Sequence, residues 1–458
     1  MNSHLCTNFT PSWGRLVNNM GFVLDYSQMK DSGYEWIGMI PNHWQVVRLQ
    51  SQLHEVNENN DPIQTTQILS LTNKLGVVPY EDKGNLGNKA KEDLSGYKIA
   101  YPDCIVANSM NILIGSVGLS HYYGCVSPVY YVFGAREGSN IKFINYLFSL
   151  PSFQKELRKY ANGILEIRLR VSAANILKQK VALPPIEEQS AIVDYLDAEC
   201  EKIDLITAEA RDSIDDYKRW KTSIISEAVT KGVHPNVSIR DSGNDRIGLV
   251  PAHWAVRKMK TFIQDVSSGL SAVTSDTAAE ESGKYVLRTS SVSTGVFKPE
   301  EVKSVLTNAV DRLICPVERD TLIMSRMNTA SMVGYCAYIA DDYPNYYLPD
   351  KLWKIHTKST LMAQYAWFLI NAPVSHDWFA SVATGTSLSM LNISLSDFYN
   401  LVVAVPPIDE QKEICAYLED QCNKIDACIS EKQALISDLE SYKKSLIYEV
   451  VTGKRKVV

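Results

Sequence analysis

The sequence predicts an α+β protein in which two globular, mixed α/β domains are joined by two long antiparallel coiled-coil helices. Two observations lead to this prediction. The first is an internal repeat, because LPPIEEQSAIVDYLD at residues 183–197 returns as VPPIDEQKEICAYLE at residues 405–419. The second is a heptad spacing of apolar residues after each copy of that motif. The repeat also predicts that the two halves are related by a pseudo-twofold axis.

The repeat extends beyond this motif. Residues 183–232 align with residues 405–454 without a gap, and 21 of these 50 positions are identical. A second match pairs DSGYEWIGMIPNHW, which begins at Asp31, with DSGNDRIGLVPAHW, which begins at Asp241. Each copy therefore has an Ile-Gly-x-x-Pro-x-His-Trp segment, a variable domain and a long helix.

These matches divide the chain into five parts. The segment before the repeat has no counterpart in the second copy, so it is either an added peripheral segment or a stretch upstream of the true start. We expect an N-terminal extension at 1–30, a first variable domain at 31–182, a first long helix at 183–232, a second variable domain at 233–404 and a second long helix at 405–458.

Each Pro-Pro-Ile motif predicts the start of a helix, because proline suits the first turn of a helix and disrupts its interior. Glu188 and Glu410 are among the acidic residues that complement the helix dipole there. Gly232 and Gly453 mark the predicted ends.

Apolar residues recur along both helices at alternating steps of four and three over five heptads. A helix of about 43 residues would be roughly 65 Å long. That length favours a mutual coiled coil over the alternative, in which each helix packs on its own domain. Lys221 and Lys443 occupy matching positions at the core edge, where they either set the register or extend to solvent. The seam residues are Leu196, Ile203, Ile214, Ile224, Leu418, Ile425, Ile436 and Leu446.

Composition excludes several classes of protein. With 45% hydrophobic and 21% charged residues the chain has no signature of disorder. No apolar run reaches the roughly 20 residues of a membrane helix. The nine cysteines show no zinc-ligand spacing, so we expect free thiols in a reducing compartment. The N-terminus lacks the pattern of a secretory signal, which predicts a cytoplasmic protein.

Charge separates the helices from the variable domains. Residues 183–232 carry 6 Lys or Arg against 12 Asp or Glu, so this helix surface repels phosphate. Any nucleic acid should meet the variable domains, which leaves the helices for spacing and for protein partners. The net charge of −6 also predicts that this chain alone binds duplex DNA weakly.

One region of the variable domains corresponds between the copies. YPDCIVANSMNILIG (101–115) aligns with ERDTLIMSRMNTASM (318–332) as a strand that opens onto a polar loop. Such a loop can read base edges, as Asn reads adenine and Arg reads guanine. The alternative is a turn in which Asn caps the backbone. The candidates are Asn108, Asn111, Ser325, Arg326 and Asn328.

A second region lies before each helix, where KELRKYANGILEIRLR (155–170) corresponds to HDWFASVATGTSLSML (376–391). The first copy offers cations suited to phosphate and guanine, and the second offers uncharged donors. The alternative for the cations is a solvated helix face. The candidates are Lys155, Arg158, Lys159, Arg168 and Arg170 in the first copy and Thr384, Thr386, Ser387 and Asn392 in the second, with Asn73, Lys74, Arg288 and Thr289 as weaker ones from earlier in each domain.

No motif for catalysis is found in the sequence. There is no G-x-x-x-x-G-K-[ST] loop for ATP, and the only Pro-Pro pairs begin the two helices. Pro349-Asp350-Lys351 faintly suggests a nuclease, but the carboxylates needed to hold metal ions are not arranged around it, so a turn is the favoured interpretation. We therefore assign no catalytic residue and no metal ligand.

The doubled Pro-Pro-Ile-x-Glu-Gln helices, the doubled Ile-Gly-x-x-Pro-x-His-Trp segments and the variable domains resemble the specificity subunit of type I restriction-modification enzymes. The resemblance covers residues 29–458. It implies two target-recognition domains, each reading one half of an asymmetric bipartite site in double-stranded DNA, and helices that act as a ruler for the spacer.

The same resemblance implies partners and cofactors. The partners would be two methyltransferase subunits and up to two motor-nuclease restriction subunits. We expect no cofactor in this chain, since S-adenosylmethionine, ATP and Mg²⁺ would sit on those partners. Two other interpretations stay open, namely a DNA-targeting subunit of a methylation-only or other phage-defence complex, and a coiled-coil adaptor that does not bind DNA.

Overall fold

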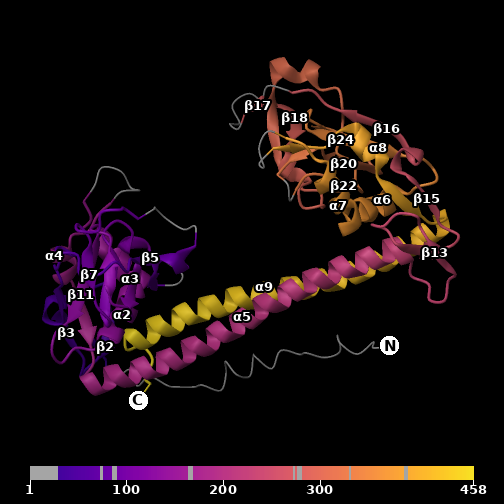
Figure 1. The fold of residues 1–458 in the computed structure, drawn as a ribbon. Coiled ribbons are helices and arrows are strands. Elements are labelled where there is room, and N and C mark those ends of the chain that lie inside the picture. The colour runs from indigo at the N-terminus through magenta and orange to yellow at the C-terminus, as the bar shows by residue number, and fades with distance from the viewer. Residues whose placement is uncertain are drawn as a thin grey trace. The chain divides into compact units, whose positions relative to one another are not determined.

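The computed structural model describes residues 29–72, 76–84, 90–162, 169–271, 274–275, 281–329, 332–385 and 390–457. The chain forms two compact units. Unit 1 joins the residues up to Glu209 with Leu435–Val458, and unit 2 is Ala210–Ala434. Each unit holds a mixed α/β body and parts of both long helices (Figure 1). Unit 2 is one continuous segment, whereas unit 1 is assembled from two.

Within the described residues, the body of unit 1 consists of short strands and short helices. The strands are β1 (Met29–Asp31), β2 (Met39–Pro41), β3 (Gln45–Arg48), β4 (Leu53–Glu55), β5 (Leu69–Thr72), β6 (Gly76–Pro79), β7 (Lys98–Ala100), β8 (Cys104–Asn108), β9 (Val117–Ser120), β10 (Gly124–Val126), β11 (Tyr130–Ala135) and β12 (Lys180–Leu183). The helices are α2 (Ile141–Ser149), α3 (Pro151–Arg158) and α4 (Ala173–Leu177), with 3-10 turns η2 (Leu49–Ser51), η3 (Tyr80–Lys83) and η4 (Ile112–Ile114).

An antiparallel sheet in the order β4-β11-β8-β9 organises unit 1. Its strand β8 is buried along its whole length, because alternate side chains enter different clusters on the two faces. Ile105 and Ala107 pack with helices α2 and α3, while Cys104 and Val106 pack with the β5–β6 hairpin. The end of β8 is therefore held firmly from both sides.

The body of unit 2 also consists of strands and short helices. The strands are β13 (Ile239–Asp241), β14 (Leu249–Pro251), β15 (Ala255–Lys258), β16 (Ile263–Ser268), β17 (Thr274–Ser275), β18 (Glu281–Leu287), β19 (Val302–Leu306), β20 (Thr321–Ser325), β21 (Met327–Asn328), β22 (Cys336–Ile339), β23 (Tyr346–Tyr347), β24 (Leu352–Thr357), β25 (Leu391–Asn392) and β26 (Val402–Val405). The helices are α6 (Ala363–Asn371), α7 (Pro373–Val382) and α8 (Leu395–Asn400), with 3-10 turns η6 (Met259–Thr261), η7 (Thr289–Ser291) and η8 (Thr307–Arg312).

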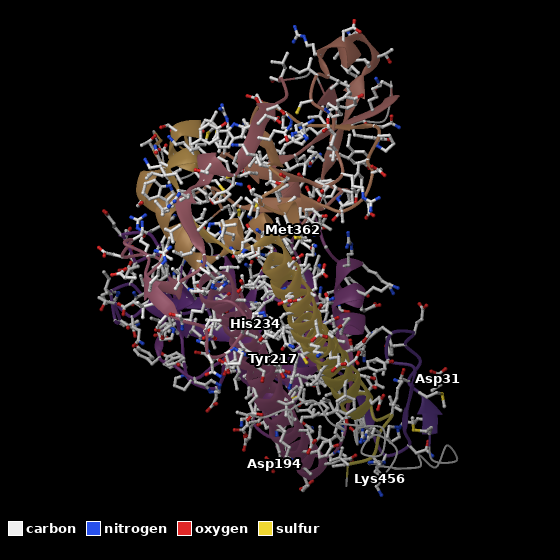
Figure 2. The ribbon with its side chains drawn as sticks, turned by 90° about the vertical axis from the view of Figure 1, so that its right-hand side faces the viewer. Asp31, Asp194, Tyr217, His234, Met362 and Lys456 are labelled. Carbon is white, nitrogen blue, oxygen red and sulfur yellow. The ribbon has the colours of Figure 1, made fainter. Side chains whose placement is uncertain are left out.

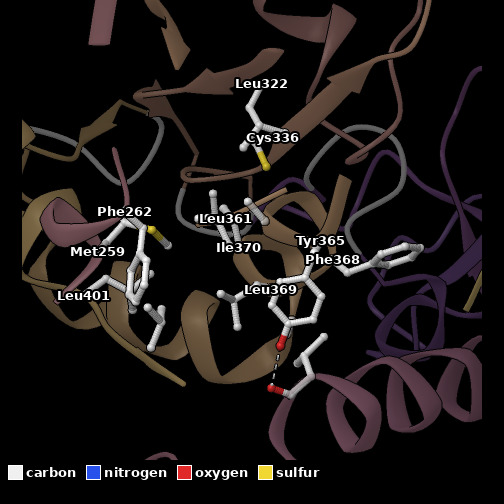
Figure 3. Packing of buried hydrophobic residues seen from close by; sticks show 14 of the residues in the cluster. Met259, Phe262, Leu322, Cys336, Leu361, Tyr365, Phe368, Leu369, Ile370 and Leu401 are labelled. Carbon is white, nitrogen blue, oxygen red and sulfur yellow. Dashed lines mark hydrogen bonds between the residues drawn. The ribbon is translucent and has the colours of Figure 1, made fainter. Parts of the chain in front are cut away.

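An antiparallel sheet in the order β16-β24-β20-β22 organises unit 2, beside a second sheet in the order β17-β19-β18-β23. Leu322 and Met324 of strand β20 face the main core with helix α6, and Ile323 faces a smaller cluster. Within the main core, Tyr365 of α6 donates a hydrogen bond to the Val229 carbonyl oxygen at 3.4 Å (Figure 3). This bond ties the body of unit 2 to the end of the first long helix.

The two long helices lie where the Pro-Pro-Ile motifs predict them, with α5 at Ile186–Lys231 and α9 at Ile408–Val451. The seam residues named above are all buried or partly buried, while Leu205 and Trp220, which lie off the seam, are exposed. Asp194 and Tyr217 mark the course of α5 among its side chains (Figure 2).

Within each unit the segments of α5 and α9 run antiparallel. In unit 1 Lys443 binds Asp204, and in unit 2 Lys221 binds Asp426 at 2.6 Å. Both aspartates end a Lys-Ile-Asp sequence that recurs in the two copies. The two lysines therefore make ion pairs between the helices rather than only extending to solvent.

Two repeated motifs meet at the start of each long helix. In unit 1 the Glu188 carboxylate accepts hydrogen bonds from Trp44 Nε1 at 3.1 Å and from His43 Nε2 at 2.7 Å. In unit 2 Glu410 binds Trp254 and His253 in the same way, at 3.1 and 2.8 Å. The acidic residues expected to serve the helix dipole thus also join the His-Trp segment to the helix.

Candidate nucleic-acid interface

The two regions that correspond in the sequence come together in unit 1, where strand β8 ends. The Ser109 carbonyl oxygen accepts a hydrogen bond from Val171 N at 3.3 Å. Asn162 and Arg170 exchange two backbone hydrogen bonds, at 2.8 and 2.9 Å. Arg170 Nη2 lies 3.7 Å from Met110 Sδ. We call residues 108–111, 162 and 169–171 the unit 1 junction.

Unit 2 has the same construction where strand β20 ends. The Arg326 carbonyl oxygen accepts a hydrogen bond from Ile393 N at 2.9 Å. Thr384 and Asn392 exchange two backbone hydrogen bonds, at 3.0 and 2.8 Å, and β21 pairs with β25. We call residues 325–328, 384 and 391–393 the unit 2 junction.

The backbone turn before each strand also corresponds. Asp103 and Asp320 both have a φ of 59°, an unusual conformation that aspartate tolerates better than most residues. Each donates its backbone N–H to the neighbouring strand at 2.8 Å, Asp103 to Ser120 and Asp320 to Ile339. The alignment therefore pairs two residues, Asp103 and Asp320, that have the same backbone conformation.

The side chains at the two junctions differ although the backbones agree. Ser109 in unit 1 stands where unit 2 has Arg326, and Arg170 stands where unit 2 has Asn392. Each junction thus carries one arginine, but on opposite segments. Ser109 and Asn162 were not among the predicted candidates, and the alignment of Ser109 with Arg326 was the signal that could have found the first.

Some of the predicted polar side chains form hydrogen bonds to the backbone close to their own position. Ser325 is fully buried, and its hydroxyl donates to the Met327 carbonyl oxygen at 3.3 Å. Asn108 is also buried, and its Oδ1 accepts from Met110 N at 3.0 Å. Asn328 Oδ1 accepts from Thr329 N at 2.9 Å. The interpretation as a turn in which Asn caps the backbone therefore fits Asn108 and Asn328, whose side-chain oxygens accept from backbone N–H groups. Asn111 and Thr384 are exposed.

The three cations on and after helix α3 are exposed. Lys159 Nζ donates to Glu156 at 2.6 Å, and this hydrogen bond raises the pKa of Lys159. Lys155 and Arg158 lie on the same short helix. The ion pair with Glu156 fits the interpretation of Lys159 as part of a solvated helix face. Lys155 is exposed on α3 and stays a candidate for phosphate.

The remaining candidates do not belong to the junctions or lie outside the described residues. Arg288 is exposed, but its Nε donates to the Val302 carbonyl oxygen at 3.1 Å, and Thr289 follows in the 3-10 turn η7. Asn73, Lys74, Arg168, Thr386 and Ser387 lie outside the residues that the structure describes.

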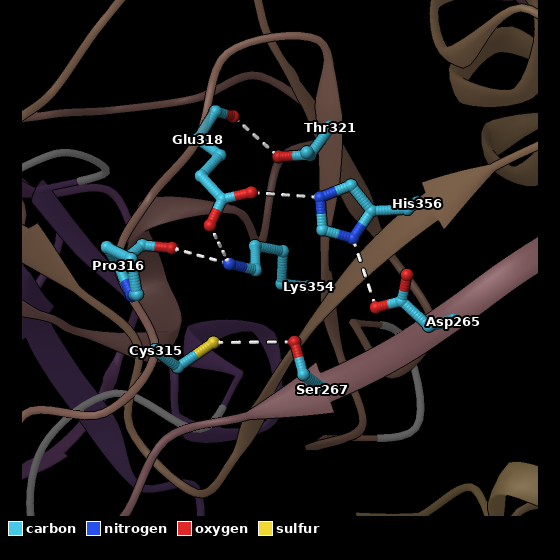
Figure 4. A network of polar contacts seen from close by, with 8 residues as sticks. All are labelled: Asp265, Ser267, Cys315, Pro316, Glu318, Thr321, Lys354 and His356. Atoms are coloured by element: carbon cyan, nitrogen blue, oxygen red, sulfur yellow. Dashed lines mark hydrogen bonds and ion pairs between the residues drawn. The ribbon is translucent and has the colours of Figure 1, made fainter.

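Unit 2 contains a polar network that the sequence did not predict. Lys354 of β24 has a buried side chain whose Nζ donates to Glu318 at 2.5 Å and to the Pro316 carbonyl oxygen at 3.1 Å (Figure 4). His356 contacts Glu318 and Asp265 at 2.9 and 3.1 Å. The hydrogen bond from Lys354 is the main reason that the pKa of Glu318 is lowered. This network fixes the loop before β20.

The described residues contain no cluster of His, Cys, Asp and Glu that could hold a metal ion. Pro349-Asp350-Lys351 forms a turn, with Leu352 N donating to the Pro349 carbonyl oxygen at 3.4 Å. A search of the described helices found none with the length and apolarity needed to cross a membrane.

Comparison with protein families identifies a match in both halves of the chain. The family model described as "Type I restriction modification DNA specificity domain" matches residues 41–214 and 251–437. The family that the sequence analysis identified by resemblance is thereby confirmed.

Curated relatives with low sequence identity are also named as specificity subunits. The type I restriction enzyme EcoKI specificity subunit of Escherichia coli (strain K12) is 20% identical over 278 residues, covering 60% of this chain and 57% of that protein. The MjaVIII specificity subunit of Methanocaldococcus jannaschii is 23% identical over 281 residues, covering 61% of this chain and 62% of that protein. The chain thus spans less than two thirds of the length of these relatives.

A solved structure described as "Structural basis underlying complex assembly and conformational transition of the type I R-M system" matches with a TM-score of 0.67 and 13% identity. The match covers 90% of this chain and 98% of that one. At this identity the similarity shows a shared fold.

Proposed function

Because the chain belongs to the type I restriction-modification DNA specificity domain family, we propose that it is a specificity subunit that reads an asymmetric bipartite site in double-stranded DNA. Each unit would read one half-site through its junction. The proposal includes the internal duplication, with one target-recognition domain in each copy.

The observation that carries the proposal is the pair of junctions. Both place a polar segment at the end of a central strand that is buried on both faces, so the segment is rigidly supported. Preorganised polar groups of this kind suit base readout, since sequence is read by hydrogen bonds to base edges. The side chains differ between the junctions, which supports two half-sites of unlike sequence.

The residues proposed to contact DNA are those that the structure leaves available at the junctions, together with the exposed Lys155 of helix α3. In unit 1 they include Asn111, Lys155 and Arg170, and in unit 2 they include Arg326, Thr384 and Asn392. Ser325 and Asn108 would support the backbone instead. The candidates outside the described residues remain part of the proposal.

The long helices are proposed to set the spacing between the half-sites and to hold protein partners. Support comes from the antiparallel pairing of α5 and α9 in each unit and from the acidic surface of α5, which does not suit phosphate. The partners would be two methyltransferase subunits and up to two restriction subunits, which would bring S-adenosylmethionine, ATP and Mg²⁺. We place this assembly in the cytoplasm.

Single-molecule methylome sequencing tests the proposal directly. A strain that expresses this chain with its methyltransferase subunit should acquire a new asymmetric bipartite adenine-methylated motif, which is absent when residues 29–458 are deleted. A stable complex that produces no new motif would favour the coiled-coil adaptor over a DNA-reading subunit. A motif without restriction of unmodified DNA would favour the methylation-only complex.

A further inference from the structure

We propose that Arg326 is the residue of unit 2 that reads a guanine in the half-site of that unit. The inference rests on the proposed function and adds to it one residue and one base.

The backbone of Arg326 is fixed on both sides. Its N–H donates to the Lys351 carbonyl oxygen at 3.2 Å, and its carbonyl oxygen accepts from Ile393 N at 2.9 Å. The preceding residue, Ser325, is fully buried and is bonded through its backbone to Gly334 and Tyr335, both at 2.9 Å. Arg326 is therefore presented from a position that cannot shift without breaking the end of the sheet.

One donor of the Arg326 guanidinium is unsatisfied. Its Nε is buried and has no hydrogen-bond partner among the described residues, although the residue as a whole remains partly exposed. A buried donor without a partner is unfavourable, and more so when it belongs to a charged group. Such a group is expected where a ligand supplies the missing acceptors.

Other arginines of this chain show the contrast. Arg136 Nε donates to the Gln50 and Leu53 carbonyl oxygens at 2.9 and 3.3 Å. Arg240 donates to the Ala252 and Trp254 carbonyl oxygens at 3.1 and 2.8 Å. These arginines support the fold, whereas Arg326 Nε donates to no described residue. The planar fork to which it belongs suits a ligand with two acceptors side by side.

Guanine and phosphate both offer two such acceptors. The difference between the junctions favours guanine, because the phosphate backbone is the same in every sequence and gives no reason for the repeats to differ. Ser109 occupies the equivalent backbone position in unit 1. Ser109 is buried whereas Arg326 is partly exposed, so at this position only unit 2 presents a side chain that can reach a base.

The test measures base preference in full-length complexes. The wild-type chain and its methyltransferase subunit would be bound to a pool of duplex oligonucleotides that is randomised across both half-sites, and the bound fraction would be sequenced. We expect a guanine preference of about 10- to 100-fold at one position of the unit 2 half-site. In Arg326→Gln this preference should disappear, while the preferences in the other half-site remain.

Two further variants keep the test decisive. Arg326→Lys retains the charge without the planar fork, so it should weaken the guanine preference less than Arg326→Gln does. Arg257→Gln removes one positive charge from the exposed strand β15 of unit 2. This control variant should keep the guanine preference. Circular dichroism and thermal melting of each variant would show whether it is folded.

Three outcomes would overturn the inference. Unchanged base preference in Arg326→Gln would exclude the residue as a reader. Weaker binding by the same factor for all sequences, with a salt slope reduced by about 1, would identify a phosphate contact instead. A wild-type complex without any sequence preference would overturn the proposed function itself, which separates that failure from a wrong assignment of Arg326.

Discussion

Lys443 Nζ on helix α9 lies 2.6 Å from Asp204 Oδ1 and 2.7 Å from Asp204 Oδ2 on helix α5, within unit 1. The lysine side chain is mostly shielded from solvent, whereas the aspartate is well exposed. Because the pair is partly solvated, we expect Lys443→Gln to lower the free energy of unfolding by about 0.5 kcal/mol. The charge-reversed double variant Lys443→Glu with Asp204→Lys should recover most of the stability lost in its two single variants.

Denaturant unfolding in a double-mutant cycle measures this coupling. Lys444→Gln, at the next and exposed position of α9, is the matched control and should have a smaller effect. If Lys443 and Lys444 variants were equally stable, the ion pair would contribute nothing to pairing of the helices.

Glu188 should contribute more to the free energy of unfolding than its exposed neighbour Glu187. It accepts hydrogen bonds from both His43 and Trp44, and Trp44 is among the largest fully buried side chains. Glu188→Ala leaves the buried indole N–H without its acceptor, so we expect a loss of about 1–3 kcal/mol in the free energy of unfolding. Glu187→Ala, in the same helical turn, should change it by less than about 0.5 kcal/mol. Equal losses in the two variants would contradict the contact.

The seam of the long helices predicts an unequal response to truncation of leucine. Leu446 is 1% exposed and belongs to the core of unit 1, while Leu205 on the facing helix is 57% exposed. Leu446→Ala should cost about 2–5 kcal/mol because it leaves a cavity. Leu205→Ala should cost less than about 1 kcal/mol. Thermal unfolding of both variants would show the difference, and a reversed order would contradict the observed seam.

His376 makes unit 2 sensitive to acid. Burial lowers the pKa of His376 to about 4 from 6.5, and its ring lies against Tyr335 with centroids 4.0 Å apart. Since the unfolded chain takes up a proton at this ring at a higher pH than the folded chain, stability is lost as the pH falls from about 6.5 to about 4.

The contribution of His376 to this loss should reach at most about 3 kcal/mol. His376→Phe keeps a ring at the site and removes its titration, so the dependence of unfolding free energy on pH between about 4 and 6.5 should flatten. Denaturant unfolding at a series of pH values measures both slopes. Parallel curves for the variant and the wild type would show that His376 does not carry this effect.

The proposed ruler makes a prediction about insertions. Four residues inserted near Lys221 in α5 alone would break its pairing with Asp426, so we expect the recognised spacer to lengthen or recognition to be lost. Four residues inserted at the facing position of α9 as well would preserve the pairing and should give a longer spacer. Methylome sequencing reports the spacer length in each strain. An unchanged spacer in the double insertion would exclude the ruler.

The sequence predicts the long helices well because their signals are local. Two prolines, acidic first turns and heptads of apolar residues all lie within the helices themselves, and α5 and α9 begin and end within a few residues of the predicted positions. Contacts between residues far apart in the sequence were harder to predict. The pairing of Trp44 with Glu188 joins two motifs that are 144 residues apart, and the sequence shows both motifs without showing that they touch.

The junctions illustrate the same limit. Alignment of the copies identified the two segments that meet at each junction, yet residue type alone did not separate the buried Ser325 from the partly exposed Arg326 beside it. Adjacent residues at a strand end face opposite sides, and the side that faces the core depends on the packed sheet. Ser109 was missed for the related reason that a serine has no evident role until its neighbour in space is known.

The division into a continuous unit 2 and a two-segment unit 1 has a consequence for synthesis on the ribosome. All residues of unit 2 have been synthesised once Ala434 has been added, whereas unit 1 then still lacks Leu435–Val458. The hydrogen bond from Lys454 Nζ to the Ile37 carbonyl oxygen, at 3.1 Å, joins residues 417 positions apart. The part of the chain made first is therefore the last to be completed. Until Leu446 and Val450 emerge, the apolar seam around Leu196 and Ile203 has no covering helix, and a nascent chain stalled before this point exposes a surface for chaperones.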